Sequence, residues 1–287
     1  MNSVKKATIL SQALPYIQKY NNKIIVIKYG GNAMINDDLK RNVIKDVVLL
    51  STIGVKVVMV HGGGPGIDTM LKKINKEIKF VNGLRHTDEE TMDIVQMVLA
   101  GQMNKNLVSM ISQEGAKAVG ISGMDSRLIE ADCNRKEMLG YVGDITNINE
   151  KIIVDLLDNG YIPVISSIGT DENNHACNIN ADLAAGAIAA KLKAENMILV
   201  SNIPGLLKDK NDESTLLPEV SLSEIDMLKE EGIIAGGMIP KVDCCVDAIE
   251  KGVKKACIID GRVPHSLLIE ILSDDGIGTM IVGDDYE

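Results

Sequence analysis

The sequence predicts an α/β fold, a three-layer αβα sandwich in which helices cover both faces of a mostly parallel central sheet. Two observations support this prediction. Short runs rich in Ile and Val alternate with longer amphipathic segments along the chain, which is typical of parallel strands joined by helices. The short runs also lack a strict apolar–polar alternation, as expected for strands that are buried on both faces.

Seven segments are predicted strands, and the segments between them are predicted helices. The strands are 23–28, 56–60, 117–121, 161–166, 196–201, 255–260 and 279–282. The helices are 37–53, 65–75, 87–114, 149–159, 181–193, 221–231, 240–251 and 264–272. Thr87 and Glu90 have the spacing of a capping box, and Asn180 or Asp182 suits the cap of the helix at 181–193. The segment 127–146 is predicted to be a β-hairpin.

A further helix is predicted ahead of the first strand, with Pro15 expected to kink it. Its apolar stripe consists of Ile9, Leu10, Ala13, Leu14 and Ile17. The sheet offers this helix no obvious place, so the stripe packs on its own subunit or meets a neighbouring one. We therefore divide the chain into an N-terminal helix at 1–20 for oligomerisation, an N-terminal lobe at 21–175 and a C-terminal lobe at 176–287.

Composition excludes several classes of protein. The formal charge of −10 argues against general nucleic-acid binding, which needs a basic face. No apolar stretch is long enough for a membrane span, and the N-terminus lacks the features of a signal peptide. The five cysteines are odd in number and without C-x-x-C spacing, so we expect no disulfide framework, no structural zinc and a cytoplasmic location.

Three consecutive glycines follow His61 at the end of a predicted strand and directly before a predicted helix. In such a sheet, ligands bind at the carboxyl ends of the strands. A helix N-terminus offers free N–H groups, and glycines let the backbone approach an anion closely. The alternative is a plain tight turn, but Gly62, Gly63 and Gly64 exceed what a turn needs. We therefore predict an anion-binding site at this loop.

Two further Gly-Gly pairs lie near lysines. Gly30 and Gly31 follow Lys28 at the end of the first strand, and a Gly-Gly pair at 236–237 precedes Lys241 at the head of a helix. The chain contains neither a Walker A motif nor a G-x-G-x-x-G fingerprint. Taken singly, Lys28 is best explained as a surface lysine at the rim of the sheet. Together, Lys28 and Lys241 can converge on one phosphoryl group, because phosphoryl transfer asks mainly for positioning and charge neutralisation.

Several polar residues are candidates for binding a substrate. Arg85 precedes a predicted helix and suits a bidentate grip on a carboxylate, although surface salt bridges are the commoner use of arginine. Asn178, Asn180 and Asp182 alternate, so that in extended backbone they point to one side. An Asn-rich turn that caps the next helix is compatible with this role. The four histidines show no ligand spacing and are interpreted as structural; they are His61, His86, His175 and His265.

These motifs, in this order, resemble the amino acid kinase family, and within it the arginine-sensitive branch that phosphorylates N-acetyl-L-glutamate. They are Lys28-Tyr-Gly-Gly, His61-Gly-Gly-Gly-Pro, Asn82-Gly-Leu-Arg85, Asn178-x-Asn180-x-Asp182 and Gly236-Gly-Met-Ile-Pro-Lys241. The resemblance implies ATP-dependent phosphorylation of the side-chain carboxylate of N-acetyl-L-glutamate. It also implies an N-terminal lobe that binds the amino acid and a C-terminal lobe that binds ATP.

The resemblance also assigns roles to residues. Lys28 and Lys241 would stabilise the transition state, and Asp182 would orient both lysines. Gly63 and Gly64 would donate N–H bonds, and substrate binding would further involve Arg85, Asn178 and Asn180. Mg²⁺ would arrive with ATP and be held largely by the phosphates, without a metal site of the protein's own. The residues expected to bind ATP are Lys28, Gly30, Gly31, Gly205, Leu206, Gly237, Met238 and Lys241.

Regulation and assembly are implied in the same way. Glu270 and Gly276 lie where ligands for inhibitory L-arginine would be expected, although core packing of the last helix and strand explains them equally well. The resemblance implies a hexamer built as a trimer of dimers, with the helix at 87–114 as a candidate dimer contact. Two rival interpretations are a kinase for a related acyl-amino acid, such as an aminoadipate derivative, and a non-catalytic arginine sensor. A dinucleotide-dependent oxidoreductase lacks its fingerprint.

Overall fold

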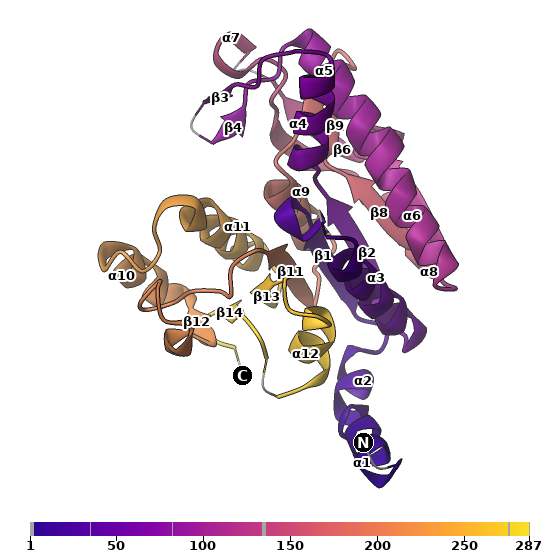
Figure 1. Cartoon of the computed structure of the whole chain (residues 1–287), viewed down its shortest axis with the longest axis vertical. Coiled ribbons are helices and arrows are strands. Elements are labelled where there is room, and N and C mark those ends of the chain that lie inside the picture. The colour runs from indigo at the N-terminus through magenta and orange to yellow at the C-terminus, as the bar shows by residue number, and fades with distance from the viewer. Residues whose placement is uncertain (1–2, 35, 82, 134–135, 275, 287) are drawn as a thin grey trace.

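The central sheet contains eight described strands, in the order β12-β14-β13-β11-β1-β2-β8-β5. The computed structural model describes residues 3–34, 36–81, 83–133, 136–274 and 276–286 (Figure 1). Every neighbouring pair of these strands is parallel except β13 and β14, which confirms the predicted mostly parallel sheet. The bounds are β1 (Ile24–Tyr29), β2 (Lys56–His61), β5 (Ala118–Ser122), β8 (Ile162–Ser166), β11 (Asn196–Ser201), β12 (Glu219–Ser221), β13 (Lys255–Asp260) and β14 (Thr279–Val282).

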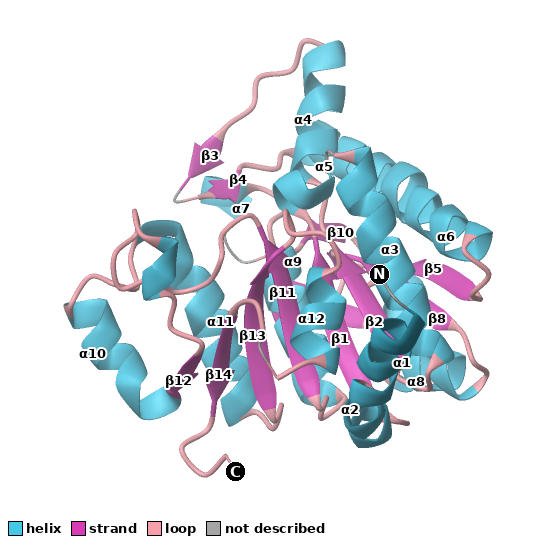
Figure 2. Cartoon of the chain, turned by 60° about the horizontal axis from the view of Figure 1, so that its bottom comes forward, coloured by secondary structure: helices cyan, strands magenta, loops and turns pink. Residues whose placement is uncertain are grey.

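Alternate residues of β1 divide the core into two layers. Ile25 and Ile27 pack with side chains of α3, α6 and α12, whereas Val26 packs with side chains of α8, α9 and α11. Because successive side chains of a strand point to opposite faces, both faces of the sheet are buried. This confirms the predicted three-layer sandwich (Figure 2). The helices are α3 (Asp37–Thr52), α6 (Asn104–Gln113), α8 (Lys151–Asp158), α9 (Ala181–Lys191), α11 (Ile239–Glu250) and α12 (Ser266–Leu272).

All of the predicted helices are present, with small shifts at their ends. The segment predicted at 87–114 forms three consecutive parts, because a π-helical turn at Met97–Met103 lies between two α-helices. None of the helices in the described part of the chain is long and apolar enough to cross a membrane. The remaining helices of the two lobes are α4 (Gly64–Lys73), α5 (Glu89–Gln96), α7 (Lys136–Leu139) and α10 (Ile225–Glu230).

Only one of the two helix caps predicted from the sequence is observed. Asn180 caps α9 as predicted, accepting bonds from two N–H groups of the first turn. The predicted capping box is wrong, because Asp88 is the N-cap of α5 and accepts a 2.8 Å hydrogen bond from the Thr91 N–H. Thr87 instead forms a β-bridge with Gly140. This tertiary contact holds Thr87 outside the helix.

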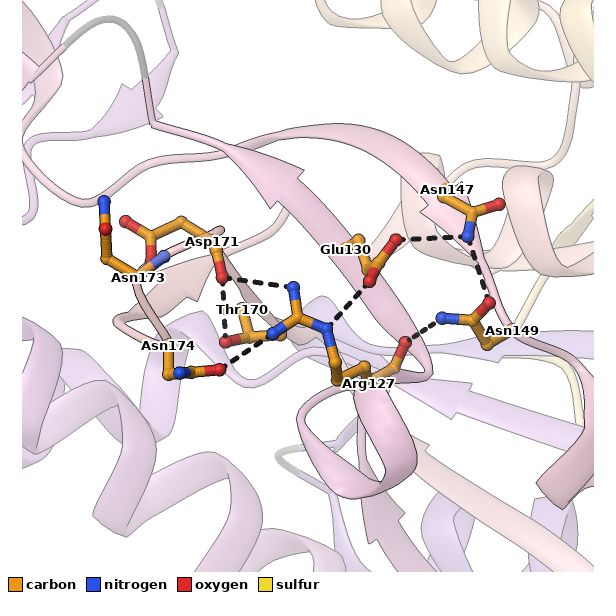
Figure 3. A network of polar contacts seen from close by, with 8 residues as sticks. All are labelled: Arg127, Glu130, Asn147, Asn149, Thr170, Asp171, Asn173 and Asn174. Carbon is orange, nitrogen blue, oxygen red and sulfur yellow. Dashed lines mark hydrogen bonds and ion pairs between the residues drawn. The ribbon is translucent and has the colours of Figure 1, made fainter.

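A second sheet, in the order β10-β9-β6-β7, covers the end of the N-terminal half. Its strands β6 and β7 are antiparallel, which confirms the hairpin predicted at 127–146. Arg127 ties the sheet together, because its Nε donates to Glu130 and its Nη1 to Asn174, each at 2.8 Å (Figure 3). The short strands β9 and β10 were not predicted from the sequence. The bounds are β6 (Ile129–Asp132), β7 (Asp144–Ile148), β9 (Ile168–Thr170) and β10 (Ala176–Asn178).

Two of the five cysteines form a disulfide, contrary to the expectation that none would. Cys133 follows β6 and is bonded to Cys177 in β10, 44 residues further along the chain. The sequence gives no sign of this pairing, because the fold of the second sheet brings the two segments together. The other three cysteines are buried free thiols, namely Cys244, Cys245 and Cys257.

The N-terminal helix is present as two helices, α1 (Ser3–Gln12) and α2 (Leu14–Tyr20), which project from the sandwich (Figure 1). Pro15 does not kink one helix but stands in the first turn of the second, a position where its missing N–H costs nothing. Leu10 is 74% exposed, so this part of the predicted stripe has no partner within the described chain. Tyr20, in contrast, is buried in the core. The side chain of Ile9, another member of that stripe, lies outside the described residues.

Candidate functional site

Three charged side chains meet where the central strands end. Lys28 lies near the end of β1, Asp182 in the first turn of α9 and Lys241 in the first turn of α11. Lys241 Nζ donates a 2.6 Å hydrogen bond to Asp182 Oδ2, and Lys28 Nζ forms a 2.9 Å ion pair with Oδ1. Burial alone would raise the pKa of the Asp182 carboxyl, but the two ammonium groups outweigh burial and lower it. The carboxylate is therefore ionised and holds both lysines at one point.

The glycine loop lies beside this cluster, between β2 and α4. None of Gly62, Gly63 and Gly64 lies in the left-handed φ region, and Gly63 has an extended φ of 173°, so a left-handed turn is not why they are glycines. A side chain on Gly63 would overlap the Met103 sulfur and a Leu99 methyl group. A Cβ on Gly62 would lie 3.1 Å from the Ala181 Cβ. Gly62 and Gly63 are therefore needed because other parts of the molecule come close to their backbone.

The loop leads directly into a helix N-terminus. α4 begins at Gly64, with Gly63 as its cap and Pro65 in its first turn, as the sequence predicts. The Gly63 carbonyl accepts the Ile67 N–H at 3.0 Å, whereas the N–H groups of Gly63 and Gly64 donate to no other described residue. Such free N–H groups at a helix start are suited to an anion.

Arg85 lines the same cavity as the glycine loop. It lies in β4 (Leu84–Arg85), which pairs with β3 (Phe80–Val81) in a small hairpin. Its Nη2 forms a 2.5 Å ion pair with Asp68 of α4, and its guanidinium lies 4.8 Å from the centre of the Phe80 ring. The buried Nη1 has no hydrogen-bond partner in the described chain. Since an unpaired buried donor is unfavourable, Nη1 is available to a ligand oxygen.

The two predicted amides have different roles. Asn178 ends β10 and donates from Nδ2 to the Thr87 hydroxyl at 3.1 Å. Asn180 uses its oxygen to cap α9, accepting the Asp182 N–H at 2.8 Å. The proposed alternation of 178, 180 and 182 in extended backbone is wrong beyond Asn180, because Asn180 is extended but α9 begins at Ala181. The cap role that the sequence offered as compatible is the one observed.

These groups line a cavity of about 230 Å³ at the carboxyl edge of the sheet. Lys28 and Asp182 of the ionised cluster line the cavity, as does Arg85. The cavity brings together residues from both halves of the chain. The site residues predicted from the sequence that line this cavity are Lys28, Gly30, Gly31, Gly63, Gly64, Arg85, Asn178, Asn180 and Asp182.

A second cavity, of about 470 Å³, lies on the other side of Lys241. Gly205 and Leu206 line it, but the Leu206 side chain is buried, and its N–H and C=O are already bonded to Thr279 and Leu217. Leu206 therefore shapes the cavity without free polar groups. The predicted residues on this cavity are Gly205, Leu206, Gly237, Met238 and Lys241, whereas Gly30 and Gly31 line the first cavity.

The sequence model of the amino acid kinase family matches residues 23–260. The chain belongs to the amino acid kinase family. Curated relatives named acetylglutamate kinase are similar over nearly its whole length. The protein from Clostridium kluyveri is 55% identical over 282 residues, which cover 98% of this chain and all of that protein. The protein from Clostridioides difficile is 51% identical, covering 98% of both chains.

Solved structures share the fold of this amino acid kinase. An N-acetylglutamate synthase from Neisseria gonorrhoeae, complexed with coenzyme A and N-acetyl-glutamate, has a TM-score of 0.85 at 23% identity, covering 98% of this chain and 64% of that one. Carbamate kinase from Giardia lamblia, bound to AMP-PNP, has a TM-score of 0.68 at 20% identity, covering 92% of this chain and 99% of that one. At these identities the likeness establishes the fold alone.

Glu270 and Gly276 of this family member lie together, apart from the residues lining either cavity. Glu270 Oε2 accepts the Ile277 N–H at 3.1 Å, and Gly276 adopts a positive φ of 59° beside it. Tyr16 of α2 donates its hydroxyl to Asp274 in the same segment. The end of α12 is therefore joined to the N-terminal helices.

A larger cavity, of about 850 Å³, lies beside the Arg127 network of the second sheet. Several acidic side chains line it, including Glu130 and Asp171. Neither Lys28 nor Lys241 lines it, so its size alone does not make it the candidate site. Within the described ranges, no group of three or more His, Cys, Asp and Glu side chains could hold a metal ion.

Sequence reasoning missed three contributors to this amino acid kinase site. Asp68 holds Arg85 in place, and its position one helical turn after Gly64 was a usable signal. The hairpin that carries Arg85 was also missed, although an Asn-Gly pair at 82–83 is a hairpin signal; Asn82 itself lies outside the described residues. The buried contacts of His61 had no signal in its spacing.

Proposed function

We propose that this protein is an acetylglutamate kinase that uses ATP to phosphorylate the side-chain carboxylate of N-acetyl-L-glutamate. The product is N-acetyl-L-glutamyl 5-phosphate, in the second step of arginine biosynthesis. One observation carries the proposal: Asp182 holds two ammonium groups at the boundary between an amino-acid-sized cavity and a larger one. The cytoplasm, which supplies ATP, is the proposed location.

The proposed chemistry needs little besides positioning. A carboxylate is already a nucleophile, so no general base is required. Lys28 and Lys241 would approach the transferring phosphoryl group from two sides, while the free N–H groups of Gly63 and Gly64 would bind its developing charge. Asp182 would keep both lysines in place without touching the phosphoryl group. The N-terminal lobe, 21–175, would hold the amino acid, and the C-terminal lobe, 176–287, the ATP.

The two cavities fit the two proposed substrates. The free Nη1 of Arg85 would bind the α-carboxylate, and the oxygen of Asn178 would accept a hydrogen bond from the substrate N–H. ATP would occupy the cavity at Gly205 and Gly237, with its γ-phosphate at Lys241. Mg²⁺ would arrive with ATP and offset the charge of its phosphates.

The test is release of ADP with N-acetyl-L-glutamate as acceptor, compared with N-acetyl-aminoadipate. Wild type should use the glutamate derivative far better. Turnover of the aminoadipate derivative alone would favour the rival kinase, and arginine binding without turnover would favour the sensor.

Lys241→Ala should lower kcat by at least about 10²-fold, a loss of roughly 3 kcal/mol in transition-state stabilisation, because it removes one electrostatic stabiliser. Lys251→Ala is a matched control, since Lys251 follows α11 and forms a surface ion pair with Asp247. An unchanged kcat in Lys241→Ala would exclude Lys241 from the proposed role.

We also propose that L-arginine inhibits the enzyme by binding near Glu270 and Gly276. Glu270 offers a carboxylate to a guanidinium group, which is the chemistry that L-arginine needs. The Glu270→Ala variant should lose inhibition while keeping its kcat. If L-arginine inhibits this variant as strongly as wild type, its site lies elsewhere.

A further inference from the structure

We infer that His61 and Asn104 are positioning residues for the phosphoryl transfer proposed above. The His61 ring holds the Gly62 carbonyl by a hydrogen bond. It thereby directs the N–H of the same peptide, that of Gly63, toward the cavity of about 230 Å³, which we call the reaction cavity. Asn104 holds the ring in the one tautomer that can do this. The inference rests on the proposed function for its catalytic part, but the arrangement itself can be tested separately.

His61 is the last residue of β2 and is fully buried. Its Nδ1 lies 2.9 Å from the Gly62 carbonyl oxygen, and its Nε2 lies 3.1 Å from Asn104 Nδ2. The ring is absent from the lining of the reaction cavity, whereas Gly62, Gly63 and Gly64 all belong to it. His61 can therefore act only through the loop backbone.

The donors and acceptors assign the tautomer. Asn104 Nδ2 also lies 2.9 Å from the carbonyl oxygen of Val164 and 3.3 Å from that of Ile121, so this atom is the amide nitrogen, and its two hydrogens are shared among three acceptors. The Asn104 oxygen accepts from Lys105 Nζ at 3.1 Å. The Gly62 carbonyl oxygen can only accept, so the single ring proton sits on Nδ1 and is donated to it, while the bare Nε2 accepts from Asn104. Burial lowers the pKa of His61 to about 4, which keeps the ring neutral.

The geometry of a peptide links this bond to the cavity. The described chain contains no cis peptide bond, so the Gly62 C=O and the Gly63 N–H point in opposite directions. With its carbonyl turned to the buried ring, this peptide directs its N–H away from the core. Three consecutive glycines have the greatest backbone freedom of any sequence, so a preorganised N–H in such a loop needs an outside restraint.

The π-helical turn at Met97–Met103 and the residue after it restrain the glycine loop by packing against Gly63 and by bonding to His61. The Asn104 N–H bonds to the Leu99 carbonyl, the five-residue spacing of a π-helix. This spacing brings Leu99, Met103 and Asn104 to one face of the helix. Leu99 and Met103 fill the space beside Gly63, while Asn104 reaches the ring of His61. One turn of helix therefore fixes both the loop and the residue that orients it.

The tautomer is the first test. In protein labelled with ¹⁵N-histidine, the ring signals of His61, identified by their loss in His61→Asn, should show a protonated Nδ1 and a bare Nε2 at neutral pH. A protonated Nε2, or a doubly protonated ring, would overturn the assignment. Because no substrate is present, this result does not depend on the proposed function.

The second test compares two replacements of His61. His61→Asn keeps an N–H at the place of Nδ1, whereas His61→Leu removes it. We expect His61→Leu to lower kcat by about 10- to 100-fold, as for loss of a supporting hydrogen bond. His61→Asn should stay within about threefold of wild type, and the KM for ATP should change little in both. The control is His175→Leu, since the exposed His175 ring bonds to Asp171 in the second sheet.

Equal losses of kcat in both variants, or no loss in His61→Leu, would overturn the inference. If His61→Leu does not fold, Asn104→Ala serves instead. It should give mixed His61 tautomers and a lower kcat, and a retained Nδ1–H tautomer with unchanged kcat would remove Asn104 from the role. If the wild-type enzyme shows no transfer to N-acetyl-L-glutamate, the proposed function fails while the tautomer result stands.

Discussion

Gly64 differs from the two glycines before it in what surrounds the missing side chain. A Cβ on Gly63 would overlap Met103, whereas the nearest atom to a Cβ on Gly64 is Arg85 Nη2, at 4.0 Å. A side chain at 63 would therefore collide with the protein, and one at 64 would enter the reaction cavity. The same residue type is required at neighbouring positions for different reasons.

Gly64→Val should consequently fold but lose activity, because its methyl groups would occupy the place of the substrate between the N–H groups and Arg85. We expect kcat/KM to fall by at least about 10²-fold, as when groups that bind the transition state are blocked. The free energy of unfolding, measured in urea, should change by less than about 1 kcal/mol. Gly283→Val is the control, since a Cβ at Gly283 would make only an ordinary contact, 3.9 Å from Ile249 Cγ2, within the described chain. Near-normal turnover of Gly64→Val would refute the role of the loop backbone.

At the scale of helices, α9 and α11 pack closely where α9 carries Asp182 and α11 carries Lys241. A Cβ on Gly186 of α9 would lie 2.8 Å from the Cys244 sulfur of α11. The Cys244 thiol donates to the Asp182 carbonyl at 3.0 Å. Since Lys241 lies one turn before Cys244, the close packing sets the distance between Lys241 and Asp182.

Gly186→Val should therefore separate the two helices. Overpacking of this kind typically costs about 1–3 kcal/mol of stability, and we expect kcat to fall by about tenfold or more as Lys241 moves from Asp182. Ala187→Val adds bulk at the next, half-buried position and serves as the control. Wild-type kcat in a folded Gly186→Val protein would show that helix spacing does not govern the lysine.

A second link between elements joins α3 to the start of α12. Asp46 is fully buried, and its Oδ1 lies 2.6 Å from His265 Nδ1. Burial raises the pKa of Asp46 to about 6 despite this bond. Its folded-state pKa thus exceeds its unfolded-state value, so the folded protein binds the proton more tightly. This contribution to stability is present below about pH 4 and is lost as the pH rises through 6.

Asp46→Asn cannot ionise but keeps an oxygen for His265. From pH 4 to 7, its stability relative to wild type should rise by roughly 2–3 kcal/mol, the equivalent of about two pKa units. Urea unfolding of both proteins at several pH values measures the difference. Asp38→Asn, on the exposed side of α3, reports the effect of removing a carboxylate from this helix. A stability difference for Asp46→Asn that is independent of pH would contradict the assignment.

At the scale of the whole molecule, the N-terminal helices leave an apolar surface uncovered. Val4, Leu10 and Leu14 are 71%, 74% and 53% exposed, values that are unusual for large apolar side chains in one segment. We propose that α1 joins subunits into a hexamer built as a trimer of dimers. The helical segment from Glu89 to Gln113 remains the candidate dimer contact.

Deletion of residues 1–12 should dissociate the hexamer into dimers while leaving catalysis intact. Deletion of 1–20 tests the same point less cleanly, because it also removes the buried Tyr20, whose ring lies 5.8 Å from Lys255 Nζ. Light scattering measures the mass of the oligomer. Urea unfolding shows whether the longer deletion also lowers the stability of the subunit. A hexamer that survives loss of 1–12 would exclude α1 as its contact.

The amino-acid sequence by itself determined the layers of this protein and most of the residues that line its candidate site. Strand and helix periods are local properties, so the central strands and the helices that cover them could be predicted. The Lys28, Lys241 and Asp182 cluster was also predictable, because the carboxyl ends of parallel strands meet at one edge. The wrong capping box at Thr87 shows where local rules stop, since a β-bridge to a distant residue prevailed over them.

Only the tertiary structure decided contacts between distant segments. The Cys133–Cys177 bond, the close packing of Gly186 on Cys244 and the hold of His61 on Gly62 through Asn104 are all of this kind. His61 illustrates the reason. Its spacing in the chain contains no information about a partner 43 residues away, and the role of a buried ring depends on which donors the fold places around it.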